Sequence, residues 1–456
     1  MKQYIILLVM LLSSFVAFPF QENSDNNELP SEVVKSIENR IEEGLTPSIA
    51  LAIIDSTGIQ YFNFGLTATK GKKVNENTIY EIGSISKAFT GILLAQQVLD
   101  EELQLEDKIN DFLPHNIKIP TKGLKEITFG NLSDHTSGLP RMPDNFKPAN
   151  PYNPYADYTV EQMYDFISNY KPIRAVGATY EYSNLAQGLL GHLLALNKNS
   201  NYEDLVIQTI AAPLGMMDTK ITFTKKMLEN LALGHAGGKQ VENWDIPTLA
   251  GAGAIRSSTS DMSKFIAANL GYVKSPIAEA MELSHKVRHH KAGEMSVALG
   301  WHIKNGELGD VIWHNGGTGG YRAFSGFVKE TGKGVVLLSN STADIDDIGF
   351  HLLDPGTELI AFPSKKDAVE IPESTLERYV GLYELQPKFT ITITNEGNQL
   401  FGQATGQDRF KIYPENDTTF YLTVVKAKIT FQLKNDTVES LTLFQGGQEI
   451  KGKKIK

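Results

Sequence analysis

Cysteine is absent from the 456 residues of this chain. Its absence excludes disulfide bonds, thiolate metal sites, a cysteine nucleophile and a lipid-modified N-terminal cysteine. Basic residues are outnumbered as well, because 43 Lys and Arg stand against 53 Asp and Glu and give a formal net charge of −10. This balance offers nothing that would attract nucleic acid or an anionic membrane surface. We therefore expect a soluble globular protein that does not bind nucleic acid.

Long apolar runs are absent too, except at the N-terminus. Lys2 is followed there by a mainly apolar stretch from Tyr4 to Phe18. This stretch is short for a membrane span and fits the hydrophobic region of a secretory signal. We therefore expect residues 1–20 to be a signal peptide. The mature protein would then be exported, to the periplasm or the medium, without stable insertion into a membrane. An uncleaved anchor is the alternative.

Several motifs of other enzyme classes do not occur. There is no His-Glu-x-x-His or comparable metal-ligand spacing, and the nucleophile motif of α/β-hydrolases, Gly-x-Ser-x-Gly, is missing. The glycines of 316–320 precede a strand-like run, with no Lys-Ser or Lys-Thr behind them, which disfavours a phosphate-binding loop. We expect neither a metal ion nor a cofactor.

A Ser-x-x-Lys pair opens an apolar helical pattern. Ser84 and Lys87 are three residues apart, and apolar residues recur after them at three-to-four spacing, as on one buried helix face. Residues i and i+3 of a helix are neighbours, so the amine lies beside the hydroxyl. A serine needs a base to attack, and lysine serves only if its pKa falls well below about 10.4. Taken alone, the pair also fits an N-cap serine and a solvated lysine.

A second polar segment precedes an apolar helix pattern over residues 185–196. Tyr182 and Asn184 stand at its start. A phenol beside a lysine can act as acid or base, and an asparagine can orient a substrate amide. In the structural alternative, Ser183 or Asn184 only caps the helix and Tyr182 packs.

The third segment, residues 313–321, joins two strand-like runs and contains four glycines. The glycines predict that the backbone approaches something closely or adopts positive φ. If a substrate is what it approaches, a backbone N–H here is a candidate oxyanion donor. A glycine-rich turn between strands is the alternative.

Strand-like runs at both ends of the first 350 residues flank a mainly helical middle. This order predicts an α+β domain whose sheet is built from both ends of the segment. Beyond a charged, proline-containing linker, short strands with Asn, Asp and Gly turns predict a small all-β barrel or sandwich. We place the two domains at residues 21–365 and 366–456. The expected elements are a helix at 31–43, strands at 48–54, 59–64, 299–303, 310–314, 321–328 and 334–339, and C-terminal strands at 390–394, 410–413, 419–425, 429–433 and 441–444.

Taken in order, these motifs resemble those of the serine β-lactamase and penicillin-binding protein superfamily. The resemblance is closest to the branch of class C β-lactamases, D,D-carboxypeptidases, D-aminopeptidases and related esterases. It implies a β-lactamase/transpeptidase-like fold, an antiparallel sheet flanked by helices with a helical insertion. The C-terminal segment Leu376–Tyr383 resembles lipocalin-like modules. The matching segments are Ser84-x-x-Lys87, Tyr182-x-Asn184, His314-Asn315-Gly316-Gly317, and the flanks Leu132–Pro140, Pro213–Met216 and Gly251–Phe265.

The resemblance implies a role for each motif residue. Ser84 would accept the acyl group, Lys87 would take the serine proton, and Tyr182 would share acid and base duty. Asn184 would orient the acyl-side amide of the substrate. The backbone N–H groups of Ser84 and Gly317 would form the oxyanion hole. His135, in the flanking segment, is expected to support packing or a turn.

Two departures from the family pattern bear on the substrate. His314 stands where the β-lactamases carry the lysine of Lys-Thr-Gly, and Asn315 replaces the threonine. A histidine is cationic only below about pH 6.5, so both changes weaken the binding of a β-lactam carboxylate.

We expect an exported serine hydrolase that forms an acyl-enzyme on Ser84. Its substrate would be a small molecule or peptide with an amide or ester bond. A D-amino-acid peptide, as for a D,D-carboxypeptidase or D-aminopeptidase, and a small ester are the favoured classes. The alternatives are a class C-like β-lactamase and a non-catalytic, penicillin-binding-protein-like scaffold.

Overall fold

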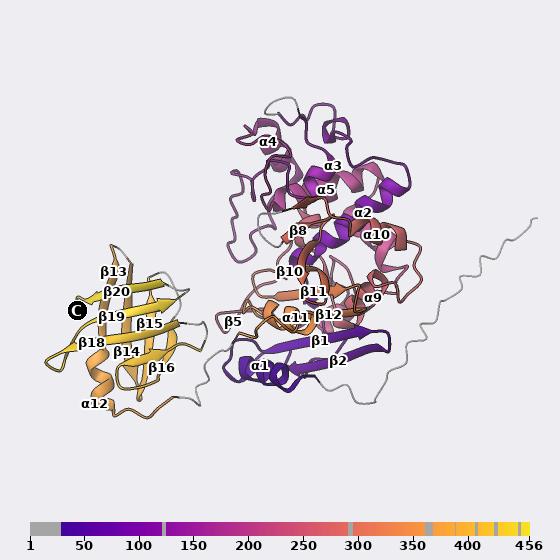
Figure 1. Cartoon of the computed structure of the whole chain (residues 1–456). Helices are drawn as coiled ribbons and strands as arrows, with labels where there is room; N and C mark the ends of the chain where they lie inside the picture. The colour runs from indigo at the N-terminus through magenta and orange to yellow at the C-terminus, as the bar shows by residue number, and fades with distance from the viewer. Residues whose placement is uncertain are drawn as a thin grey trace, which may run out of the picture.

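A computed structural model of the chain shows a larger α+β domain followed by a smaller all-β domain (Figure 1). The predicted signal peptide, residues 1–20, lies outside the described residues. No helix within the described ranges is long and apolar enough to cross a membrane. The structure describes residues 29–120, 125–290, 295–360, 368–387, 389–405, 409–423, 427–445 and 448–456.

The larger domain is built on an eight-stranded sheet in the order β2-β1-β12-β11-β10-β9-β8-β7. Strand β1 pairs antiparallel with β12, so that Ile49 lies opposite Ser339. The first and last strands of the domain are therefore neighbours, which confirms the prediction of a sheet built from both ends. The strands are β1 (Ser48–Asp55), β2 (Gly58–Gly65), β7 (His289–His290), β8 (Met295–Val297), β9 (His302–Gly306), β10 (Gly309–Gly317), β11 (Arg322–Val328) and β12 (Lys333–Ser339).

The two faces of the sheet bury different helices because successive side chains of a strand point to opposite sides. On β1, Ile49 and Leu51 join the cluster formed with α1 (Ser31–Glu42) and α11 (Asp346–Leu353). Ala50 and Ala52 join the larger cluster on the other face. That second face is covered by α2 (Ser86–Leu99), α9 (Thr259–Asn269) and α10 (Ala278–Ser284).

Helix α2 is the centre of the helical part of the domain (Figure 1). We predicted one buried face, and this is wrong, because Ser86 to Ala95 are buried without interruption. Helices α5, α8 and α10 all pack against α2, so it has no solvent face until its last turn, where Leu99 is 41% exposed. The remaining helices here are α3 (Phe129–Ser133), α4 (Val160–Asn169), α5 (Asn184–Asn197), α6 (Tyr202–Val206), α7 (Lys225–Glu229) and α8 (Ala250–Gly253).

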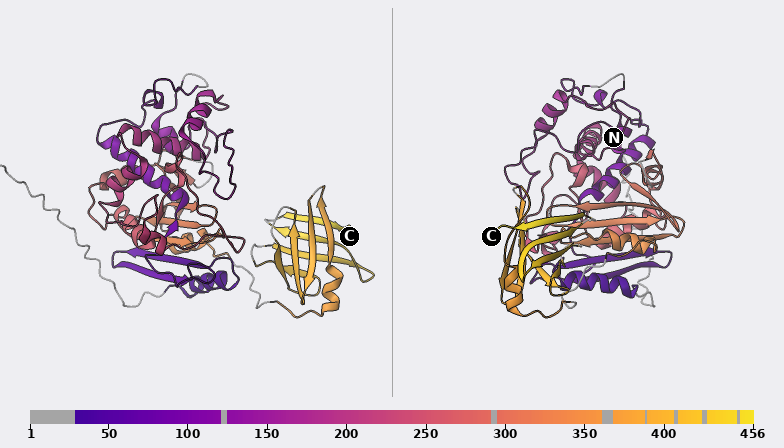
Figure 2. Two further views of the ribbon diagram at one scale, coloured as in Figure 1. Left: turned by 180° about the vertical axis from the view of Figure 1, so that it is seen from behind. Right: turned by 60° about the vertical axis from the view of Figure 1, so that its left-hand side comes forward.

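The C-terminal strands close into a barrel with its own core (Figure 2). Tyr379 stacks on Phe431 at 4.4 Å between ring centroids, and both belong to a cluster that shares no residue with the larger domain. The predicted barrel-like domain is thereby confirmed. It contains α12 (Glu373–Leu376), β13 (Gly381–Gln386), β14 (Phe389–Glu396), β15 (Gln399–Ala404), β16 (Phe410–Pro414), β17 (Thr419–Tyr421), β18 (Ala427–Lys434), β19 (Thr437–Gln445) and β20 (Gln448–Lys454).

Candidate active site

Ser84 sits on a single 3₁₀ turn, Gly83–Ile85, immediately before α2. Gly83 has φ +51°, a conformation that favours glycine. A Cβ on Gly83 would also lie 2.8 Å from the backbone nitrogen of Gly317 on β10. The turn therefore presents Ser84 close to the end of β10 only because the preceding residue lacks a side chain.

The three predicted catalytic side chains meet at one oxygen atom. Lys87 Nζ lies 2.9 Å from Ser84 Oγ, and the Tyr182 hydroxyl donates to the same Oγ at 2.8 Å. Lys87 Nζ also lies 2.6 Å from the carbonyl oxygen of Ala252 on α8 and 4.7 Å from the Tyr182 ring centroid. The Ser84 hydroxyl can therefore accept from the phenol while it donates to the amine.

The surroundings fix the protonation of both partners. Lys87 is fully buried, and burial, aided by the positive charge of Arg141, holds its pKa well below 10.5. Burial also raises the pKa of Tyr182 to about 12, against the opposing effects of Ser84 and Arg141. Lys87 therefore loses its proton at a lower pH than an exposed lysine does, and its neutral amine can then accept a proton, while the phenol retains its own. The alternative of a solvated Lys87 is wrong.

The second motif stands at the N-terminus of α5. Ser183 caps the helix, since its Oγ accepts from Ala186 N at 2.9 Å, and Ser183 N donates to His135 Nδ1 at 3.1 Å. The cap thus leaves Tyr182 and Asn184 free for other contacts. Asn184 Oδ1 is buried without a hydrogen-bond partner among the described residues. It offers an acceptor to a ligand N–H.

The third motif lies on β10. His314 faces the catalytic side, with its ring centroid 6.4 Å from that of Tyr182 and 4.7 Å from that of His302. Its Nδ1 lies 2.6 Å from the Asn315 carbonyl oxygen. His314 is buried, and burial together with His302 and Lys87 holds its pKa well below 6.5. At neutral pH His314 is therefore an uncharged side chain.

Gly316 and Gly317 let β10 approach the Ser84 turn. A Cβ on Gly316 would lie 1.9 Å from the Ile82 carbonyl oxygen and 3.3 Å from Ser84 N. The backbone nitrogens of Ser84 and Gly317 thus border the same small space, the arrangement that an oxyanion hole requires. No glycine of 316–320 has positive φ. The prediction that this backbone closely approaches another group is correct, and at Gly316 that group is the backbone of Ile82.

The prediction that the Asn315 side chain binds substrate is wrong. Side chains alternate along a strand, and Asn315 shares a face with Trp313, whose ring packs against Phe350 of α11. Its Nδ2 donates to Asp346 Oδ2 at 2.5 Å. The structure brings His314 and Gly316 to Ser84 and turns the Asn315 side chain toward α11.

Three groups near the site carried no recognisable sequence signal. The Arg141 Cζ lies 5.0 Å from the Tyr182 ring centroid, although Arg141 belongs to a loop rich in Pro, Asn and Tyr. Tyr155 of that loop packs against Trp244 at 5.2 Å between ring centroids. Glu81 Oε1 accepts from Trp244 N at 2.9 Å. A hint for Arg141 was its position immediately after the Leu132–Pro140 segment.

Two loops, which contain residues 152–153 and residues 244–245, contact each other and form a wall beside the third motif. Asn153 Nδ2 donates to Asp245 Oδ2 at 2.9 Å, and Asp245 N donates to Asn153 Oδ1 at 2.8 Å. Trp244 Nε1 donates to the Tyr152 carbonyl at 3.1 Å. A Cβ on Gly319 would lie 2.5 Å from Trp244 Nε1, so this wall reaches the end of β10.

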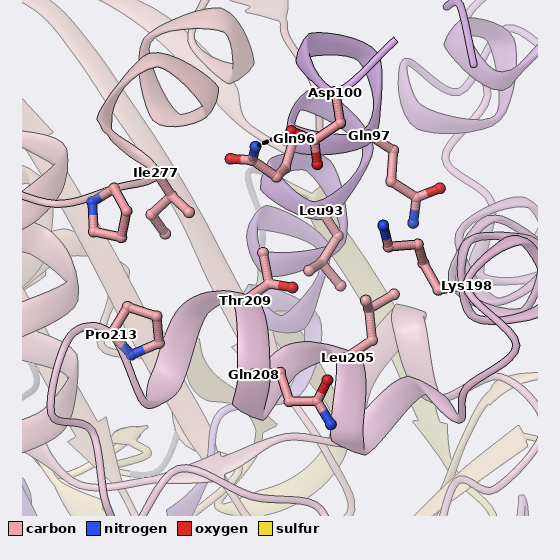
Figure 3. Close-up of a pocket in the computed structure, with 11 residues that line it drawn as sticks. Leu93, Gln96, Gln97, Asp100, Lys198, Leu205, Gln208, Thr209, Pro213 and Ile277 are labelled. Atoms are coloured by element: carbon pink, nitrogen blue, oxygen red, sulfur yellow. Dashed lines mark hydrogen bonds between the residues drawn. The ribbon is translucent and has the colours of Figure 1, made fainter. Parts of the chain in front are cut away.

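A separate cavity of about 270 Å³ opens elsewhere, at the C-terminal half of α2 (Figure 3). Its lining includes Leu93, Gln97 and Lys198, and Gln96 Nε2 donates to Asp100 Oδ1 at 2.9 Å at its rim. Its lining contains none of Ser84, Lys87, Tyr182, Asn184 and residues 314–317. Within the described ranges, no group of His, Asp and Glu side chains is arranged to hold a metal ion.

Comparisons with known proteins show which families and solved structures the chain resembles. A beta-lactamase family model matches residues 34–351, and a domain of unknown function (DUF3471) matches 365–454. A penicillin-binding protein of Bacillus subtilis (strain 168) is 26% identical over 428 residues, which are 86% of this chain and 91% of that protein. A beta-lactamase of Pseudomonas fluorescens is 26% identical over 68% of this chain and 92% of its own length. A solved class C beta-lactamase has a TM-score of 0.64 at 23% identity, over 75% of this chain and 100% of that one.

Proposed function

The chain belongs to the beta-lactamase family, and we propose that it hydrolyses an amide or ester through an acyl-enzyme on Ser84. The observation that carries the proposal is the pair of contacts at Ser84 Oγ, 2.9 Å from Lys87 Nζ and 2.8 Å from the Tyr182 hydroxyl. A neutral, buried amine at that distance can take the serine proton.

The contacts support the following sequence of steps. Lys87 takes the Ser84 proton while Oγ attacks the substrate carbonyl carbon, and the N–H groups of Ser84 and Gly317 stabilise the oxyanion. The carbonyl re-forms, and the leaving group departs with a proton from the Tyr182 hydroxyl. Protonated Lys87 then gives its proton to Tyr182. Water then gives a proton to the Lys87 amine and attacks the acyl-serine carbonyl. The bond from that carbon to Ser84 Oγ breaks, Lys87 returns the proton to Oγ, and the acid is released.

The favoured substrates are D-amino-acid peptides and small esters. Support comes from His314, which is buried and uncharged at neutral pH. It cannot act as the fixed cation that a lysine provides at this position in β-lactamases, so a β-lactam carboxylate has no partner there. Asn184 Oδ1, a buried acceptor without a partner among the described residues, suits an amide N–H in the acyl part of the substrate.

A class C-like β-lactamase is the second candidate function. The observation in its favour is the similarity to beta-lactamases of Pseudomonas fluorescens and Yersinia enterocolitica, at 26% and 24% identity. A scaffold without catalysis is the third, and the intact Ser84, Lys87 and Tyr182 argue against it. We further propose that the protein is exported, which rests on the apolar run of residues 4–18.

The test is hydrolysis of a panel of 4-nitrophenyl esters, D-alanyl dipeptides and a chromogenic cephalosporin by purified protein. Ser84→Ala should abolish turnover, and Lys87→Met should lower kcat/KM by about 10² to 10⁴-fold. Ser56→Ala, which removes an exposed hydroxyl from the β1–β2 turn, is the matched control and should keep full activity. Turnover that persists in Ser84→Ala would sink the proposal. Fastest turnover of the cephalosporin would favour the β-lactamase.

A further inference from the structure

Arg141 differs from the other arginines of the described residues in the contacts of its guanidinium group. Its side chain is exposed, and no carboxylate or carbonyl oxygen among the described residues meets its guanidinium. A guanidinium that contacts an aromatic ring but no oxygen acceptor of the protein is available to an anion from solution. The others each contact an oxygen acceptor: Arg40 with Asp347, Arg174 with Glu181, Arg256 with Glu81, Arg288 with Asp134, Arg322 with the Thr342 carbonyl, Arg378 with Asp436 and Arg409 with Glu396.

The free guanidinium stands beside the reacting groups. Its Cζ lies 5.0 Å from the centroid of the Tyr182 ring, and the Tyr182 hydroxyl contacts Ser84 Oγ. The positive charge of Arg141 contributes to the lowered pKa of Lys87 and opposes the rise in the pKa of Tyr182. A substrate whose carbonyl reaches Ser84 therefore passes within the field of Arg141.

The backbone ties Arg141 to the helix that carries the second motif. Its carbonyl oxygen accepts from Asn184 N at 3.0 Å and from Leu185 N at 3.3 Å. In addition, Ser183 Oγ donates to the Pro140 carbonyl at 2.6 Å. The cation and the buried Asn184 Oδ1, which has no partner in the described chain, are thus held on adjacent backbone at one side of the site.

Two other basic groups near Ser84, Lys87 and His314, are buried, and burial disfavours the charged form of each. Lys87 is buried and is the base of the proposed reaction. His314 is also buried, and burial holds its pKa well below 6.5. Arg141 is exposed and carries its charge beside the Tyr182 ring, so an anionic substrate group can reach it from solution.

We propose that Arg141 binds a carboxylate on the acyl side of the scissile bond, while Asn184 Oδ1 accepts an N–H of the same acyl group. The inference rests on the proposed function and names its substrate class, acyl donors that contain both an amide N–H and a free carboxylate. The planar fork of an arginine matches a carboxylate with two parallel hydrogen bonds. Such a contact favours the binding of one acyl group over another.

The test compares two esters that differ only in this charge. They are the 4-nitrophenyl esters of N-succinyl-D-alanine and of its neutral succinamoyl analogue. Wild type should prefer the succinyl ester, and Arg141→Gln should lower the ratio of their kcat/KM values by about ten- to a hundredfold. Arg141→Lys should lower it less, because the charge remains. Lys147→Gln removes an exposed cation from the same loop and should leave the ratio unchanged.

A binding measurement separates this inference from the proposed function. Calorimetry on Ser84→Ala needs no turnover and should show N-succinyl-D-alaninamide binding more tightly than its succinamoyl analogue, with the difference lost in Ser84→Ala/Arg141→Gln. Equal effects of Arg141→Gln on both esters would mean that the charge only tunes Lys87 and Tyr182, and would overturn the inference. Equal binding of both ligands to Ser84→Ala would overturn it as well. Absence of Ser84-dependent turnover would count against the proposed function alone.

Discussion

At the scale of single residues, burial decides what each group of the site can do. Lys87 and His314 are almost completely buried, and burial is the largest cause of the lowered pKa of each. The same cause raises the pKa of Tyr182 to about 12. A neutral Lys87 amine can take the Ser84 proton and a neutral Tyr182 phenol can donate one to the leaving group, so neither group is a buried ion before the attack.

The pH dependence of acylation tests this assignment. Acylation needs neutral Lys87, so kcat/KM should rise with pH through the pKa of Lys87 and then stay level, since Tyr182 loses its proton only near 12. Arg141→Gln removes a positive charge that disfavours protonated Lys87. Its rising limb should therefore move to higher pH. We would measure kcat/KM for a neutral ester from acid to alkaline pH, and a limb that stays in place would contradict the assignment.

The order of the three motifs along the sequence identified most of the site residues. The direction in which each side chain points could not be predicted from that order. The sequence singled out Ser84, Lys87 and Tyr182 because three motifs occur in a family order, and their side chains do converge. Asn315 was misjudged because its orientation depends on strand alternation and on α11, where Asp346 binds it. Arg141 went unnoticed because a single loop cation forms no pattern.

At the scale of elements, the site depends on how closely β10 approaches the 3₁₀ turn that carries Ser84. Glycine makes this approach possible on both sides, at Gly83 and at Gly316. The backbone donors of Ser84 and Gly317 belong to these two elements. The spacing of the oxyanion donors is therefore set by packing of backbone on backbone.

Gly316→Ala should damage catalysis more than it damages the fold. Its Cβ would lie 1.9 Å from the Ile82 carbonyl oxygen, so β10 and the Ser84 turn must separate, at a cost of about 1–3 kcal/mol. We expect kcat/KM to fall by at least about tenfold, since each misplaced oxyanion donor costs much of its effect. Ester hydrolysis and thermal unfolding would be measured together.

Gly253→Ala is the matched control, because a Cβ there meets its nearest atom at 3.5 Å. It should keep activity and stability close to those of the unmodified protein. Equal activity of Gly316→Ala and Gly253→Ala would show that the close approach of β10 does not matter for catalysis.

The pattern of apolar residues in the sequence predicted some strands accurately and missed others. Strands that are continuous apolar runs, such as β1 and β12, were predicted to within a residue of their observed bounds. The closing strand β20 was not predicted, because Gln448–Lys454 is largely polar and charged, with Gly452 buried and its neighbours mostly exposed. A strand of this kind is fixed by its partners β13 and β19, and its own sequence carries little strand signal.

At the scale of the whole molecule, the chain builds two hydrophobic cores that share no residues. The larger domain contains one cluster on each face of its sheet, and the barrel contains its own. Independent cores predict independent folding. Ser84, Lys87, Tyr182 and residues 314–317 all lie in the larger domain, so we expect the proposed chemistry at Ser84 not to require the barrel.

Removal of the barrel tests this separation. A protein of residues 21–365 should fold, and its acylation rate constant should change by less than about threefold, or roughly 0.5 kcal/mol. Substrate preference should change more than acylation if the barrel contributes to substrate selection. Calorimetry of the full chain should show two unfolding transitions, of which the shorter protein keeps one. A single cooperative transition, or an unfolded shorter protein, would contradict the independence of the cores.

The most direct test of the central claim is the intact mass of residues 21–456 after incubation with a penicillin and, separately, with an activated N-acyl-D-alanine ester. The account predicts a mass increase equal to the acyl group in the unmodified protein and none in Ser84→Ala, with Ser56→Ala behaving like the unmodified protein. An adduct from the ester alone would favour the peptidase or esterase, and a penicillin adduct that lasts would favour a penicillin-binding role. An adduct that survives in Ser84→Ala, or no adduct and no consumption of either reagent, would contradict an acyl-enzyme on Ser84.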